Sequence, residues 1–223
     1  MSASRRPRWW QAAAGALAVG LTVTLSQSTT TAAFTAQTVD AGSSATAAPA
    51  FCSAPGRVDT LQLTGVVDTG IYQSQPGTNY AGTATIGVIS SSGALARSLI
   101  KFPLTSKPSG CVVTSAVLSL RVSNGTTGST IEVHRAAAAW NATTVNWNTA
   151  PGLTGTVATA SSASNGMVIT FDVATLVAEL YAGPDYGFLI KDAAEGVGNN
   201  TQLFHSADTG TASTRPKLVV TWG

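Results

Sequence analysis

The chain has 223 residues, and only 10% of them are charged, against roughly 25% in an average soluble domain. Its formal net charge of +2 includes three arginines at positions 5, 6 and 8, and the remaining chain holds nine basic and ten acidic residues. This balance excludes the basic surface with which proteins bind nucleic acids or anionic lipids, so we expect neither partner.

Residues 1–33 have the pattern of a secretory signal peptide. Three arginines precede an apolar run over residues 12–25, and small residues follow up to Ala33. The apolar run is short for a membrane span, which needs about 20 residues. We therefore expect cleavage near Ala33, secretion, and no stable membrane span afterwards. An uncleaved membrane anchor is the alternative.

Residues 34–57 are rich in Ala, Ser, Thr and Gly, which predicts a flexible lead-in to a domain spanning residues 58–223. The two cysteines, Cys52 and Cys111, are an even pair in the exported part of the chain. Extracellular compartments are oxidising, so we expect these two residues to form a disulfide.

After the lead-in, apolar residues alternate with polar ones in short runs. The alternating pairs and triplets lie within residues 100–102, 116–122, 131–135, 169–173, 188–190 and 218–222. Turn-forming clusters separate them at residues 123–128, 182–185 and 196–200. Many short alternating strands between turns predict an all-β fold, a β-sandwich or jelly roll.

One segment departs from this alternation. Val173, Leu176, Val177 and Leu180 follow the i, i+3, i+4, i+7 spacing of a helix face. The sequence therefore predicts one short helix that covers an end of the sandwich.

The most distinctive motif is the segment 140–151, which reads WNATTVNWNTAP. It belongs to an ordered set of motifs: VDT at 67–69, NYAG at 79–82, RSLIKF at 97–102, FDV at 171–173, YGFL at 186–189, FHSAD at 204–208 and RPKLVVTW at 215–222. In this order and spacing the chain resembles the DNRLRE domain family, which overlaps carbohydrate-binding module family 96. The resemblance implies a secreted, all-β and non-catalytic protein.

The residues offer little support for an enzyme. His205 lies near Ser206 and Asp208, which are the residue types of a catalytic triad. However, adjacent side chains of a strand point to opposite faces, and no G-x-S-x-G motif is present. We therefore expect a binding protein.

Aromatic side chains are the first candidates for a binding site, because the C–H face of a sugar ring suits an aromatic face. Trp140 precedes a polar loop, and Tyr72 and Tyr80 flank another. Trp147, in a strand-like run, and Trp222, at the end of the last strand, fit core positions better. Burial in the core is the alternative for Trp140, and loop anchoring is the alternative for the tyrosines.

Basic side chains are the second candidates, because the resemblance includes members associated with acidic polysaccharides such as alginate. Arg97 and Lys101 are four residues apart and share a strand face, and Arg121 and Arg135 fit neighbouring strands. Such side chains pair with carboxylates. A solvated outer sheet face is the alternative reading of these four residues.

A structural calcium ion is the one metal worth considering, with Asp68, Asn79 and Asp172 as candidate ligands. No other cofactor is expected. The sequence thus predicts a secreted, monomeric, non-catalytic module that binds polysaccharide, an acidic one being an option. A structural or adhesive cell-surface domain without sugar specificity is the alternative.

Overall fold

The computed structural model describes residues 51–223. The strands in this part are β1 (Val58–Leu61), β2 (Val67–Tyr72), β3 (Thr85–Ser91), β4 (Ala94–Lys101), β5 (Val113–Gly125), β6 (Thr130–Ala136), β7 (Leu153–Ser161), β8 (Val168–Asp172), β9 (Phe188–Asp192), β10 (Thr201–His205) and β11 (Lys217–Trp222). One α-helix, α1 (Ala174–Ala182), and two 3-10 turns, η1 (Trp147–Thr149) and η2 (Ala212–Thr214), complete the described elements.

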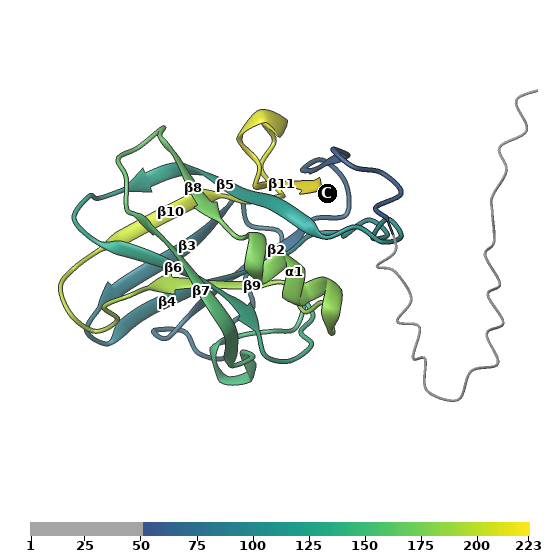
Figure 1. The fold of residues 1–223 in the computed structure, drawn as a ribbon. Helices are drawn as coiled ribbons and strands as arrows, with labels where there is room; N and C mark the ends of the chain where they lie inside the picture. The colour runs from purple at the N-terminus through teal and green to yellow at the C-terminus, as the bar shows by residue number, and fades with distance from the viewer. Residues whose placement is uncertain (1–50) are drawn as a thin grey trace, which may run out of the picture. The chain divides into compact units, whose positions relative to one another are not determined.

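The strands form one antiparallel sheet that curls into two facing layers. Its hydrogen-bonded path is β1-β11-β5-β10-β3-β4-β9-β6-β7, with β2 added to β4 and β8 added to β5. In Figure 1, β5 and β8 lie in one layer, and β4, β6, β7 and β9 lie in the other, while β10 pairs with both β5 and β3 and so joins the layers. The predicted all-β sandwich is confirmed.

The main hydrophobic core lies between the two layers. Every second residue of the central strands points into it, as the period of two predicts. In β5, for example, Ala116, Leu118, Leu120 and Val122 are buried, whereas the residues between them are partly exposed. Facing side chains from the other layer include Ile100, Val133 and Ile190.

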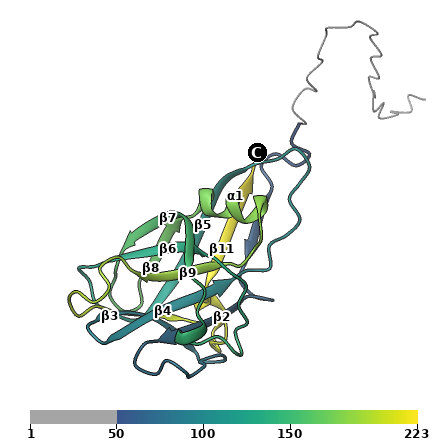
Figure 2. The ribbon, with the colours of Figure 1, turned by 90° about the horizontal axis from the view of Figure 1, so that it is seen from below.

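The predicted helix is confirmed as α1, which buries Leu176, Val177 and Leu180 in the main core. Asp172 precedes it, and its carboxylate accepts a hydrogen bond of 3.1 Å from the backbone N–H of Ala174. Figure 2 shows α1 at the end of the domain where the C-terminus lies, away from the β3–β4 connection.

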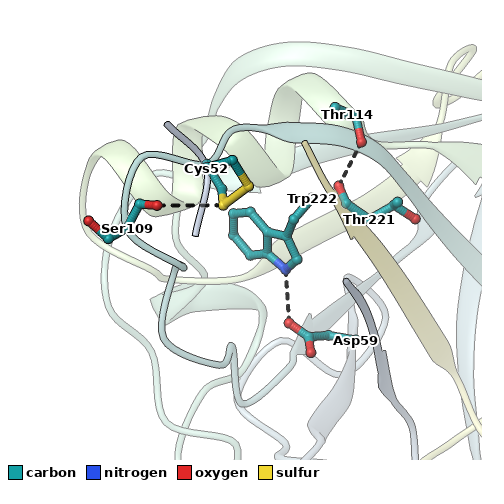
Figure 3. The surroundings of a disulfide bond; sticks show 7 residues. Cys52, Asp59, Ser109, Thr114, Thr221 and Trp222 are labelled. Atoms are coloured by element: carbon teal, nitrogen blue, oxygen red, sulfur yellow. Dashed lines mark hydrogen bonds between the residues drawn. A yellow bond between two sulfur atoms is a disulfide. The ribbon is translucent and has the colours of Figure 1, made fainter. Parts of the chain in front are cut away.

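The disulfide between Cys52 and Cys111 is also confirmed. Figure 3 shows it beside Trp222, whose indole N–H donates to the Asp59 carboxylate at 2.9 Å. Gly56 N–H donates to the Trp222 carbonyl oxygen at 2.7 Å. Residues 51–57, the end of the expected lead-in, are thus bonded to the body of the domain.

The expected signal peptide and the rest of the lead-in lie outside the described residues. Within residues 51–223, none of the helices has both the length and the apolar character required to cross a membrane.

Candidate functional site

A second, smaller apolar cluster lies on the outer face of the layer that contains β2, β4 and β9. It consists of Ile71, Leu99, Ala136, Val145 and Leu189, all of which are buried. Leu99 and Leu189 are register partners on neighbouring strands and therefore point to the same face. This face is opposite to that of their neighbours Ile100 and Ile190, which belong to the main core.

The 140–151 loop covers this outer cluster. Val145 lies inside the cluster, and Trp140 and Trp147 pack against it. The two tryptophans of the motif are thus held by an apolar floor that the strands present outward. Each is half-buried, so part of each ring remains accessible.

Asn79 ties this loop to the rest of the domain. Its side-chain amide donates to the carbonyl oxygens of Ala142 at 2.7 Å and Val145 at 2.6 Å. Its side-chain oxygen accepts from the backbone N–H of Ala81 at 3.1 Å. Two motifs that are far apart in the sequence, NYAG and the 140–151 segment, therefore meet through Asn79.

The strand-like interpretation of Trp147 is wrong, because this residue begins the 3-10 turn η1. Asn146 caps the turn. Its side-chain oxygen accepts from the backbone N–H groups of Asn148 at 3.0 Å and Thr149 at 3.2 Å. An asparagine at this position favours a turn over a strand, because its side chain binds the donors that a strand would pair with a neighbour.

Two hollows open beside Trp140, and both Trp140 and Lys101 line each of them. The larger hollow has a volume of about 480 Å³, and its other walls come from residues 65, 67, 102, 103 and 141–143. The smaller one, of about 100 Å³, is completed by Ala139, Asp185 and Tyr186. We call the two together the Trp140 site.

Hydrogen bonds orient the Trp140 site. The indole N–H of Trp140 donates to the carbonyl oxygen of Tyr186 at 2.7 Å, which directs the ring's polar edge inward. The Asp185 carboxylate accepts from the backbone N–H of Gly187 at 3.0 Å. The site is therefore built by the 140–151 loop, the end of β4, and the segment before β9.

The electrostatics of the site come from one cation and one carboxylate. Lys101 has no ion-pair partner within 4.0 Å in the described part of the chain. Partial burial raises the pKa of the Asp185 carboxyl group, while the hydrogen bond from Gly187 and the charge of Lys101 act in the opposite direction. The site can thus offer an ammonium donor, a carboxylate acceptor and an aromatic surface.

The other predicted basic residues do not join Lys101 in one groove. Arg97 shares the outer face of β4 with it but forms two hydrogen bonds to Glu195, of 2.7 and 2.8 Å. Its guanidinium carbon also lies 5.0 Å from the centroid of the Trp147 ring. These contacts with Glu195 and Trp147 leave Arg97 less available to bind the carboxylate of a ligand.

Arg121 and Arg135 do not lie on neighbouring strands. Arg121 is in β5, which pairs with β8, β10 and β11, whereas Arg135 is in β6, which pairs with β7 and β9. Arg135 forms an ion pair of 3.2 Å with Glu179 of α1. Sequence alternation places residues on faces but does not order the strands, which explains this error.

Tyr72 and Tyr80 form a pair of their own. Their ring centroids are 4.6 Å apart, and the Tyr80 hydroxyl donates to the Gln75 side chain. Burial raises the pKa of the Tyr72 hydroxyl. Its ring covers Gly70, where an added Cβ would lie 2.7 Å from a ring carbon. Neither tyrosine lines the Trp140 site.

Each of the three candidate calcium ligands forms hydrogen bonds with a different part of the domain. Asp68 is buried in β2, and its carboxylate accepts from the Ala207 N–H at 2.7 Å. Asn79 holds the 140–151 loop and Asp172 precedes α1, as described above. No group of three or more His, Cys, Asp or Glu residues within 51–223 is arranged to hold a metal ion.

Asp185 and Tyr186 line the smaller hollow but were not among the candidate binding residues. Asp185 ends a turn-forming segment, and Tyr186 begins the YGFL motif, and neither feature indicates a contact with Trp140. The segment with His205, Ser206 and Asp208, which has the residue types of a catalytic triad, contains a local turn. In this turn the Ser206 hydroxyl accepts a hydrogen bond of 2.8 Å from the backbone N–H of Asp208.

The family model described as carbohydrate-binding module family 96 matches residues 59–222. The match begins within β1 and ends at the last residue of β11, so it includes the Trp140 site. A comparison with curated proteins finds no match. The chain therefore belongs to carbohydrate-binding module family 96.

Proposed function

We propose that this domain is a secreted, non-catalytic module that binds an acidic polysaccharide at the Trp140 site. Membership of a carbohydrate-binding family supports glycan binding in general. We assign glycan binding to the Trp140 site because Trp140 and Lys101 line the same two hollows.

The chemistry of the site fits a uronate residue. The electron-rich face of an indole attracts the C–H groups of a sugar ring. Lys101, without a partner of its own in the described chain, supplies a charge-assisted hydrogen bond to a carboxylate. The volume of the larger hollow, about 480 Å³, lies within the range of about 300–1,000 Å³ for small-molecule sites.

Secretion is the second part of the proposal. The Cys52–Cys111 disulfide supports it, because structural disulfides persist in oxidising compartments and are rare in the cytosol. The signal-peptide pattern at residues 1–33 points the same way.

Affinity electrophoresis on alginate and on a neutral glucan tests the binding proposal. Alginate should retard the protein, and Lys101→Ala should weaken its binding by about 1–3 kcal/mol, the contribution of a hydrogen bond to a charged group. Raising the salt concentration should weaken it too. Lys107→Ala is the matched control, because Lys107 is exposed and lines neither hollow.

The Asp185→Asn substitution should have the opposite effect on alginate binding from Lys101→Ala. The asparagine can still accept the hydrogen bond from Gly187, but it carries no charge that repels a uronate. Binding to alginate at neutral pH should therefore become tighter. If neither polymer retards the protein, a structural or adhesive role without sugar specificity replaces our proposal.

A further inference from the structure

Another hollow, which shares no lining residue with the Trp140 site, opens at the end of the sandwich where the end of β3 meets two connections. These connections are residues 126–129 between β5 and β6 and residues 193–200 between β9 and β10. Figure 1 shows these connections at the end of the domain opposite to α1. The hollow has a volume of about 430 Å³, and we call it the loop-end hollow.

The lining of the loop-end hollow is hydrophilic. Its polar members are Ser90, Thr126, Thr127, Ser129, Thr130, Asp192, Asn199 and Asn200, and its remaining members are small residues and Val197. No aromatic side chain and no Lys or Arg lines it. This composition contrasts with the Trp140 site, where an indole and an ammonium group dominate.

A buried network holds the walls of this hollow in place. The Asp192 carboxylate, only 1% exposed, accepts from the Asn200 side chain at 2.7 Å, from the Ser129 hydroxyl, and from the Ala194 N–H at 2.8 Å. The Thr126 hydroxyl donates to the Asn200 side-chain oxygen at 2.7 Å. One buried acid thus links the two connections.

The end of β3 is also bonded to this region. The Ser91 hydroxyl donates to the side-chain oxygen of Asn199 at 2.5 Å. Asn199 is exposed, and within the described residues its side-chain nitrogen donates no hydrogen bond. Thr127 and Thr130 are exposed as well, and within the described residues their hydroxyl groups form no hydrogen bond. Free donors and acceptors therefore face a hollow whose walls are already ordered.

We propose that the loop-end hollow is a second binding site, for a neutral saccharide that it recognises through hydroxyl groups. Hydroxyl and amide groups are the natural partners of sugar hydroxyls, since each can both donate and accept. The lining carries one carboxylate and no cation, which disfavours a uronate. The ordered walls reduce the conformational cost of binding.

The loop-end hollow and the Trp140 site would give the domain two chemically different contacts. One binds acidic sugar and the other binds neutral sugar. The domain would then join two polymers, or two regions of one mixed polymer, and the combined affinity would exceed that of either contact.

Titration with a neutral hexa-oligosaccharide, monitored by backbone amide chemical shifts, tests the inference. Cello-, xylo- and manno-oligosaccharides serve as probes, each to tens of millimolar. The expected result is a saturable shift of amides in residues 126–130 and 193–200 with at least one probe. The shifts should persist in the Lys101→Ala variant, which separates this site from the proposed function.

Asn199→Ala and Thr127→Ala should each weaken this binding by about 2- to 10-fold, as expected for the loss of one neutral hydrogen bond. Asn124→Ala is the matched control, because Asn124 is exposed on β5 but does not line the hollow. The inference is overturned if no neutral probe shifts these amides, or if only an alginate oligomer does. Shifts confined to residues around Trp140 would overturn it while supporting the proposed function.

Discussion

The layer that contains β4 and β9 has two apolar faces that differ in how they are covered. Its inner face packs against the strands of the other layer and forms the main core. Its outer face is covered by the 140–151 loop, which packs on Leu99 and Leu189. Strands pack through a regular repeat, whereas the loop depends on a few hydrogen bonds, chiefly those of Asn79.

This difference relates stability to function. The inner core gives the domain its fold, and the loop places Trp140 next to Lys101. Changes to the outer cluster should therefore affect ligand binding more than stability, and changes to the inner core should do the reverse. Neighbouring residues of β9 allow a direct comparison.

Ile190→Ala and Leu189→Ala test the comparison most strongly. Both side chains are fully buried, one in the inner core and one in the outer cluster. We expect Ile190→Ala to cost about 4 kcal/mol of unfolding free energy, and Leu189→Ala about 2 kcal/mol, because the loop can settle into the space that is left. Urea denaturation measures both.

The binding measurement completes this test. Leu189→Ala should weaken alginate binding, whereas Ile190→Ala should leave it unchanged under conditions in which the variant is folded. Equal losses of stability, or unchanged binding in Leu189→Ala, would show that the loop is as firmly supported as the inner core.

Removal of the disulfide by Cys52→Ser with Cys111→Ser acts on the inner core alone. Cys111 is a member of that core, and the bond joins residues separated by 59 positions. The chain-entropy estimate for such a loop is roughly 4 kcal/mol, and measured losses are often smaller. Denaturation with and without reductant checks this: reductant should destabilise the wild type and leave the double variant unaffected.

The inner core was predictable from sequence and the outer cluster was not. Alternation at Leu118, Leu120 and Ile190 assigns each side chain to a face, because the strand period of two is a local property. Val145 has no such pattern around it. Its burial depends on Asn79, which lies 66 positions away in the chain.

The candidate site shows the same limit. Residue type singled out Trp140 and Lys101 separately, but only the loop's position brings them together. By residue type and strand face, Arg97 is as good a candidate for binding a carboxylate as Lys101. In the fold, however, its guanidinium donates a hydrogen bond of 2.7 Å to Glu195, which lies 98 positions away in the chain. Asp185 was missed because a turn-forming segment does not show which residues it will face.

A buried carboxyl group on β2 predicts that the stability of the domain depends on pH. Burial, together with the charge of Asp208, raises the pKa of Asp68 to about 6, while hydrogen bonds from Ala207 and Ser206 act against the shift. The folded state therefore binds a proton more tightly than the unfolded state. Stability should fall as the pH rises from about 4 to about 6, by about 3 kcal/mol.

Asp68→Asn should remove this dependence, because the asparagine can still accept the hydrogen bond from Ala207 without ionising. We expect the variant to be more stable than the wild type at pH 8 and to differ little from it at pH 4. Urea denaturation at a series of pH values measures the slope. The assignment would be contradicted if the stability of the two proteins changed by the same amount between pH 4 and pH 6, or if the wild type became more stable over that range.

The smallest expected change in stability, and the most specific change in function, comes from Asn79→Ala. The substitution leaves the carbonyl oxygens of Ala142 and Val145 without the donors that hold the 140–151 loop. We expect a loss of about 1–2 kcal/mol, because water can reach part of the loop and replace these bonds.

Asn148→Ala is the matched control, since Asn148 is an exposed residue of the same loop whose side chain forms no hydrogen bond in the described structure. Alginate binding should weaken in Asn79→Ala and remain unchanged in Asn148→Ala. The fluorescence of Trp140 and Trp147 should change only in Asn79→Ala. If Asn79→Ala destabilises the domain by several kcal/mol while its alginate binding is unaffected, the loop supports the fold rather than the site, and the distinction between the two faces of this layer fails.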